Sequence, residues 1–169
     1  MNASVSLIDP SWYLVQTKPR QEFRALEHLE IQHYQCFLPT LEVEKVRRGK
    51  VSKVIEPLFS RYLFIQLDRV TSNWGQVRYT RGVSKLVAFG NNFATVAEHI
   101  IDAFRHPTEH RYVPMFSPGD RVVIDSGPFF GIEGIYQIAD GEARALVLIE
   151  LINQPQMLKF GKEMLRKVM

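Results

Sequence analysis

Apolar residues in the first half of the chain come in short runs that are separated by polar or glycine-containing turns. Runs of this length that are rich in valine, isoleucine, tyrosine and phenylalanine are typical of strands. Gly49 lies between two such runs, in the sequence RRGK, and predicts the turn of a β-hairpin. The strands are expected at residues 11–17, 36–46, 51–55, 62–67 and 83–89.

Two segments of the same region have the spacing of amphipathic helices. Pro19 is favourable at the start of a helix and predicts one over residues 20–35. Thr95 and Glu98 form a capping-box pattern that predicts a second helix. The residues expected to face the sheet are Phe23, Leu26, Leu29 and His33 in the first helix and Ala97, Ile100, Ile101 and Phe104 in the second. Residues 11–105 are therefore expected to form an α+β domain, an antiparallel sheet with flanking helices.

The pattern changes after residue 105. Residues 106–116 are polar, contain two prolines and are typical of a linker. From residue 117 the apolar runs become shorter and closely spaced, which indicates a small β-barrel as a second domain over residues 117–169. Its strands are expected at residues 121–125, 134–138, 146–152, 157–160 and 164–168.

Residues 145–152, with the sequence ALVLIELI, fit two secondary structures. As a strand, the segment would be apolar on both faces, although a small barrel buries only one face of each strand. It is also rich in alanine, leucine and glutamate, which favour helices. A helix would gather one apolar stripe of Ala145, Leu148, Ile149 and Ile152. The sequence leaves both structures open, and such a conflict is typical of a functional segment.

The composition indicates a folded protein without a membrane span. Hydrophobic residues make up 46% of the chain, and no apolar run reaches the roughly 18 residues that a spanning helix needs. The first ten residues lack the features of a secretory signal, and the single cysteine, Cys36, excludes an intramolecular disulfide, so a reducing cytoplasm is expected. The net charge of +3 comes wholly from residues 1–104, which hold 13 Lys+Arg against 10 Asp+Glu. This excess fits a phosphate-facing surface and equally an ordinary solvated one.

The sequence contains no pattern that predicts catalysis or metal binding. His106 and His110 are four residues apart, but Pro107 prevents a regular helix from presenting both on one face, and zinc needs further ligands. Glycine-rich phosphate loops, serine elbows and paired acidic motifs are absent. Cys36 is expected to be a small apolar core residue. A binding protein is therefore predicted rather than an enzyme, with no metal and no cofactor.

One face of the first predicted helix carries hydrogen-bond donors and almost no acids. Its residues are Arg20, Gln21, Arg24, His28 and Gln35. Arginine suits guanine, glutamine suits adenine, and all of these side chains can reach phosphates. The alternative is a solvated helix face, which the helix alone does not exclude.

Several motifs follow one another along the chain: SWYLVQTKPRQE at residues 11–22, EPLFSRYLFIQLD at 56–68 and TRGVSKLVAFG at 80–90. They resemble the N-terminal (NGN) domain of the NusG superfamily of transcription elongation factors. PGDRVVIDSGPFFGIEG at 118–134 resembles the KOW motif of its C-terminal barrel. The resemblance covers nearly the whole chain after Pro10 and implies a monomeric, cytoplasmic regulator of transcription that acts by binding.

The resemblance also implies two partners and the residues that bind them. One surface would grip the clamp helices of RNA polymerase and comprises Tyr62, Phe64, Phe89, Ile101 and Phe104. A second surface would face the exposed non-template DNA strand and comprises Lys18, Arg20, Gln21, Arg24, His28, Thr80 and Arg81. Binding to both partners would suppress pausing and termination at specific operons.

Within the superfamily, DGEARALVLIELIN at residues 140–153 resembles the tail of the RfaH-like branch. The C-terminal domain of that branch is either a helical hairpin that masks the N-terminal domain or a free barrel that recruits the ribosome. The resemblance implies an interdomain ion pair between Glu56 and Arg144 in the masked state. It also places Leu148 and Ile152 on the masking helix.

Two positions depart from the RfaH-like pattern. Residues 73–76 read NWGQ where the branch has a His-Thr-Thr-Thr loop that touches the polymerase. Pro128 lies inside the first helix of the expected hairpin and favours the barrel, because proline is unfavourable in a helix interior. A general NusG-type factor without sequence preference is therefore an alternative, and a ribosome- or RNA-binding KOW module is another.

Overall fold

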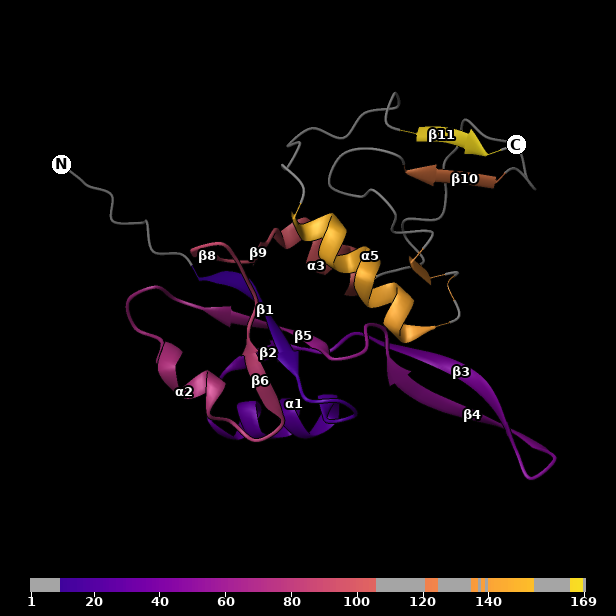
Figure 1. Ribbon diagram of the computed structural model, residues 1–169, viewed down its shortest axis with the longest axis horizontal. Helices are drawn as coiled ribbons and strands as arrows, with labels where there is room; N and C mark the ends of the chain where they lie inside the picture. Colours follow the sequence, from indigo (N-terminus) through magenta and orange to yellow (C-terminus); the bar gives the residue numbers. More distant parts are fainter. Residues whose placement is uncertain are drawn as a thin grey trace. The chain divides into compact units, whose positions relative to one another are not determined.

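A computed structural model of the protein describes residues 10–105, 121–124, 135–136, 138, 140–153 and 165–168 (Figure 1). The chain divides into two compact units, residues 1–95 and 96–169. The predicted linker, the strand predicted at residues 157–160 and Pro128 lie outside the described residues.

The first unit is built on a five-stranded sheet with the order β2-β5-β1-β6, and β9 also pairs with β1. Its strands are β1 (Ser11–Thr17), β2 (Gln35–Phe37), β5 (Tyr62–Leu67), β6 (Val83–Leu86) and β9 (Thr95–Val96). The pairs of β1 with β5 and β6, and of β2 with β5, are antiparallel. The predicted strands at 11–17 and 62–67 are confirmed to the residue, and each contains four consecutive apolar residues, 12–15 and 62–65.

The helix α1 (Glu22–Ile31) packs on this sheet and is shorter at both ends than predicted. Its buried residues are Glu22, Ala25 and Leu29, so the prediction that Phe23 and His33 face the sheet is wrong. Phe23 is 49% exposed, and His33 lies beyond the helix end with a left-handed φ of +71°.

The buried stripe is centred on Ala25 because the turn before β6 comes very close to the helix. Gly82 has φ +88°, and a β-carbon there would lie 2.9 Å from the backbone nitrogen of Ala25. Only a small helical residue opposite a glycine permits this approach. Tyr13, Val15, Leu63 and Ile65 of the central strands are fully or almost fully buried in the same core cluster.

A two-stranded arm of β3 (Thr40–Arg47) and β4 (Lys50–Pro57) extends from the sheet (Figure 1). Its turn contains Gly49 with φ +77°, as the RRGK sequence predicts. Cys36 lies in β2 and pairs with β5, so its assignment to the hairpin is wrong. The strand predicted at 83–89 is divided between β6 and β7 (Ala88–Phe89), and β7 pairs with β8 (Asn92–Phe93).

The helix α2 (Trp74–Arg78), a single turn capped by Asn73, was not predicted from the sequence. The Asn73 side chain accepts a hydrogen bond from the amide of Gln76 (3.2 Å). The stretch NWGQ thus forms the start of a short helix.

The described part of the second unit includes the helices α3 (Glu98–Arg105) and α5 (Gly141–Asn153). The capping box predicted for α3 is wrong: Thr95 belongs to β9, and the carbonyl of Ala97 accepts from the amides of Ile100 (3.0 Å) and Ile101 (3.3 Å). β10 (Arg121–Ile124) and β11 (Leu165–Val168) form an antiparallel pair, close to two predicted barrel strands. Ile135 and Tyr136 are helical, so the strand predicted there is wrong.

Candidate functional site

The turn that leads from β1 into α1 is held by backbone hydrogen bonds to two other segments. The amide of Thr17 donates to the carbonyl of Arg61 (2.8 Å), and the amide of Lys18 donates to the carbonyl of Gly82 (2.8 Å). Within the turn, the amide of Gln21 donates to the carbonyl of Lys18 (3.1 Å). The turn therefore has a fixed position relative to the start of β5 and the start of β6.

These bonds gather positive charge at the start of α1. Lys18 and Arg20 belong to the turn, and Arg61 and Arg81 lie at or beside the residues that accept its hydrogen bonds. Arg24 follows on the first turns of α1 and is exposed. The start of a helix also carries a partial positive charge. This cluster, which we call the α1 basic face, has the chemistry that binds phosphate groups.

The residues predicted to contact DNA are mostly accessible on the α1 basic face. Lys18, Arg20, Arg24 and Arg81 are exposed, and Gln21 and His28 are half-buried. The structure therefore brings six of the seven predicted residues to the surface, along α1 and in the turns beside its start.

Thr80 differs from the other six because it is only 7% exposed. Its hydroxyl accepts a hydrogen bond from Nε2 of Gln32 (2.8 Å) and donates one to the carbonyl of Gln76 (3.0 Å). Both hydrogen-bonding roles of the hydroxyl are thus engaged between α1 and α2. Thr80 therefore lies below the surface and links Gln32 to Gln76 through its hydroxyl.

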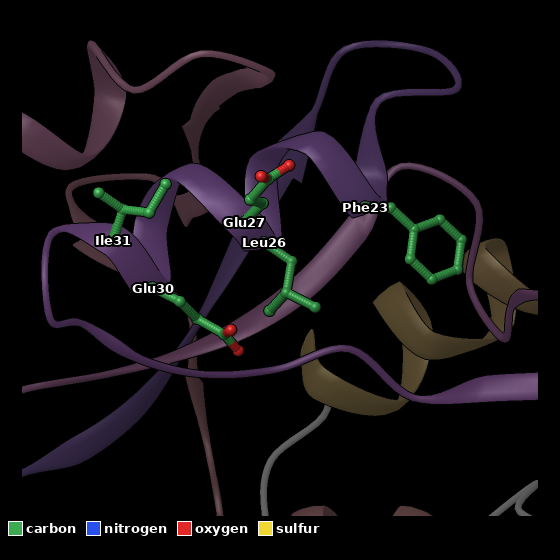
Figure 2. Close-up of a pocket in the computed structure, with 5 residues that line it drawn as sticks. All are labelled: Phe23, Leu26, Glu27, Glu30 and Ile31. Carbon is green, nitrogen blue, oxygen red and sulfur yellow. The ribbon is translucent and has the colours of Figure 1, made fainter.

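A shallow groove of about 410 Å³ runs along another side of α1, and Figure 2 shows its lining residues. They are Phe23, Leu26, Glu27, Glu30 and Ile31. Phe23 and Ile31 lie at opposite ends of the groove, with Leu26 between them (Figure 2). Carboxylates repel phosphates, so the groove does not suit nucleic acid. Arg24 and His28 form the neighbouring stripe of the helix, four residues apart.

The aromatic residues predicted to bind polymerase differ in their burial within the first unit. Tyr62 is half-buried, and its hydroxyl accepts a hydrogen bond from Nε2 of Gln16 (3.1 Å). Phe89 is half-buried as well. Phe64 is completely buried and packs against the rings of Phe37 and Phe59, with centroids 6.0 and 6.4 Å away.

The two predicted polymerase-binding residues of the second unit are also buried. Ile101 is 0% and Phe104 is 4% exposed. The hydroxyl of Tyr136 donates to the carbonyl of Phe104 (3.4 Å), which ties the segment before α5 to α3. Three of the five predicted residues, including Phe64, are thus covered in the structure and have to be uncovered before they can touch a partner.

Residues 145–152, which the sequence leaves open between strand and helix, lie in the helix α5. Asp140 caps this helix: its carboxylate accepts from the amide of Glu142 (3.0 Å). The guanidinium of Arg144 is fully buried and donates to the carbonyl of Ile138 (2.7 Å). Leu148 and Ile152 are buried, whereas Leu146 is 69% exposed.

Glu56, the predicted partner of Arg144, lies in β4 opposite Leu41. Its carboxylate forms an ion pair with Nζ of Lys45 (3.2 Å), and its side chain is 23% exposed. Partly exposed ion pairs of this kind contribute at most about 1 kcal/mol to the stability of a fold. This ion pair therefore stabilises the β3–β4 arm only slightly.

The single cysteine of the chain, Cys36, has a thiol of low reactivity. Burial, with a smaller effect of the negative charge of Glu30, raises the pKa of Cys36 to about 12. The thiol is therefore protonated at neutral pH and is a poor nucleophile. Among the residues that the structure describes, no group of three histidine, cysteine or acidic side chains could hold a metal. In the same part of the chain, no helix is long and apolar enough to cross a membrane.

Arg61 is the residue of this site that the sequence analysis missed. It precedes β5 and adopts a left-handed φ of +72°. No feature of the sequence distinguishes it from the other arginines, because its place in the site depends on this backbone conformation.

Comparisons with known proteins agree on one family. The sequence profile of the family described as "Transcription termination factor nusG" matches residues 10–105. The transcription termination/antitermination protein NusG of Thermus thermophilus is 29% identical over 169 residues, covering 85% of this chain and 90% of that protein. NusG of Escherichia coli K12 is 25% identical over 153 residues, covering 80% and 83%. NusG of Campylobacter jejuni is 27% identical over 142 residues, covering 76% and 80%.

A solved structure, described as domain interaction in Thermotoga maritima NusG, is also similar, with 21% identity and a TM-score of 0.44. The match covers 72% of this chain and 75% of that one. The assignment rests on the profile, which matches more than half of the chain, from the first strand through α3. This protein therefore belongs to the NusG family of transcription termination and antitermination factors.

Proposed function

We propose that this NusG-family protein acts in the cytoplasm on elongating RNA polymerase, by binding its clamp helices and the non-template DNA strand. It reduces pausing and termination at specific operons, in the manner of the RfaH-like branch. The observation that carries this proposal is α5: a helix occupies part of the C-terminal region that resembles a KOW domain. Its buried leucines lie in the same compact unit as Ile101 and Phe104, which the resemblance assigns to polymerase.

The proposed polymerase surface consists of Tyr62, Phe64, Phe89, Ile101 and Phe104. The burial of Ile101 and Phe104 in the unit that contains α5 supports a masked state, because large apolar side chains are unfavourable in water when no partner is present. In this proposal α5 provides the cover through Leu148 and Ile152, and polymerase replaces that cover on binding. A ligand shifts such an equilibrium only by its preference for one of the two states.

The masked state is proposed to include the ion pair between Glu56 and Arg144 that the resemblance implies. The complete burial of Arg144 supports a nearby carboxylate, since a buried guanidinium requires charge compensation. After release, the C-terminal domain is proposed to form the KOW barrel and to reach the ribosome. The antiparallel pair of β10 and β11 is compatible with such a barrel.

The proposed DNA contact is the α1 basic face, and replacing Arg24 by alanine tests it. Arg24 is exposed and lies one stripe away from the acidic groove. If Arg24 reads a base, the loss is about 1–3 kcal/mol of binding free energy on the preferred sequence, with relaxed preference. The measurement is the affinity for elongation complexes that carry different non-template sequences.

Glu27→Ala is the control for this test, because Glu27 is exposed on the same helix but lines the groove. It should leave binding unchanged or slightly stronger. Equal affinity of Arg24→Ala and the wild-type protein on every scaffold would reject the DNA contact and leave a solvated helix face.

A general NusG factor without sequence preference is the second candidate, and the names of the three relatives favour it. The same scaffolds discriminate between the two candidates. A general factor binds all non-template sequences equally, whereas the specialised factor prefers one.

A further inference from the structure

Arg61 occupies a backbone conformation that favours glycine. Its φ is +72°, and in this region a side chain with a β-carbon is strained whereas glycine is not. Unlike Arg48, which lies in the exposed turn of the β3–β4 arm, Arg61 is partly buried beside the first turn of α1. A strained residue at such a place indicates that its side chain has a role that glycine could not fill.

The side chain and backbone of Arg61 both bind the end of β1. Its carbonyl accepts from the amide of Thr17 (2.8 Å), and its Nε donates back to the carbonyl of Thr17 (3.2 Å). Thr17 is fully buried, and Lys18 follows it directly. Arg61 therefore fixes both backbone groups of the residue at which the basic turn begins.

Arg61 also lies near the one acid at the start of α1. Glu22 is only 6% exposed, and the backbone groups of Glu22 and Arg61 lower the pKa of its carboxyl against the larger effect of burial. Burial raises the pKa of Glu22, and the positive charge of Arg61 counteracts that effect. An uncompensated carboxylate here would oppose the approach of a phosphate to Lys18 and Arg20.

We propose that Arg61 is a positioning residue for DNA binding: its guanidinium holds the Thr17 carbonyl and thereby fixes Lys18 and Arg20 for contact with the phosphate backbone. This inference rests on the proposed DNA-binding function of the α1 basic face. Arg61 itself does not need to touch DNA. Pre-ordered cations bind phosphates better because less conformational freedom is lost on binding.

The test is Arg61→Gly in the full-length protein, which removes the guanidinium but keeps a residue that adopts the left-handed backbone freely. Affinity for an elongation complex with exposed non-template DNA should fall about tenfold, and the dependence of affinity on salt should become shallower. The thermal unfolding midpoint should stay within a few degrees of the wild type, because relief of strain offsets the lost hydrogen bond.

Two further variants separate positioning from charge. Arg61→Lys keeps the positive charge but lacks the Nε donor, so its affinity should stay close to that of Arg61→Gly. Full rescue by lysine would overturn the proposal in favour of a direct or purely electrostatic contact. Arg48→Gly removes the same charge at another left-handed arginine, and an equal loss there would show that only net charge matters.

Arg20→Ala distinguishes failure of this inference from failure of the proposed function. If Arg20→Ala and Arg24→Ala weaken DNA binding but Arg61→Gly binds like the wild type, the positioning role is wrong and the DNA contact stands. If none of these variants affects binding, the proposed DNA contact itself is wrong.

Discussion

Replacing Leu148 by alanine is expected to increase the affinity of the protein for elongating RNA polymerase by about tenfold or more. Leu148 is completely buried in α5. Truncating a buried leucine costs about 2–5 kcal/mol of packing, which weakens the proposed cover of the polymerase-binding residues. Equilibrium titration of reconstituted elongation complexes with the labelled full-length protein measures the effect.

Leu146→Ala is the matched control for this prediction. It makes the same truncation with the same change in helix propensity, two residues away, but Leu146 is 69% exposed. Its affinity for polymerase should equal that of the wild type. An equal increase in affinity for polymerase in both variants, or no increase for Leu148→Ala, would mean that α5 does not restrain binding. That result would favour a general NusG factor.

Gly82→Ala is expected to destabilise the first unit by several kcal/mol, roughly 2–4, because two unfavourable effects add. The residue has φ +88°, and the new β-carbon would lie 2.9 Å from the backbone nitrogen of Ala25 and 3.1 Å from its Cα. Backbone atoms of a packed helix cannot move aside as the end of a flexible side chain can. Urea unfolding followed by fluorescence measures the loss.

Gly49→Ala separates these two effects. Gly49 also has a left-handed φ, of +77°, but a β-carbon there would meet no atom within 4 Å. Gly49→Ala should therefore lower the free energy of unfolding only by the cost of the left-handed backbone, about 1 kcal/mol. If both variants lose the same amount, the close contact between Gly82 and Ala25 is not what determines the packing of α1.

The sequence predicted the central strands well, because each contains four consecutive apolar residues, 12–15 and 62–65. β1 and β5 agree with the prediction at both ends. The orientation of α1 was predicted wrongly, because apolarity alone does not tell whether Phe23 or Ala25 faces the sheet. The larger side chain remains exposed, since the close approach of Gly82 admits only the smaller one.

The candidate site was predicted in part for a similar reason. Arg20 and Arg24 could be found from a helix face that lacks acids, Lys18 was implied only by the family resemblance, and all three are exposed. Thr80 and Arg61 could not be placed correctly, because their roles depend on partners distant in sequence: Thr80 bonds to Gln32, and Arg61 bonds to Thr17.

The sequence did not decide between strand and helix at residues 145–152. The segment is apolar on both faces of a strand and forms an apolar stripe as a helix, so local propensity does not select one structure. The structure shows a helix whose buried side includes Arg144, Leu148 and Ile152. Tertiary packing decides such cases, which is why the segment can be a switch.

We expect α5 to be helical while the protein is free and to leave its position when polymerase binds. NMR of the full-length protein with ¹³C-labelled alanine tests it most directly, because Ala143 and Ala145 lie in α5. The account predicts helical carbon shifts for both residues in the free protein and loss of these shifts in a saturated elongation complex. Strand-like shifts in the free protein, or unchanged helical shifts in the bound state, would contradict it.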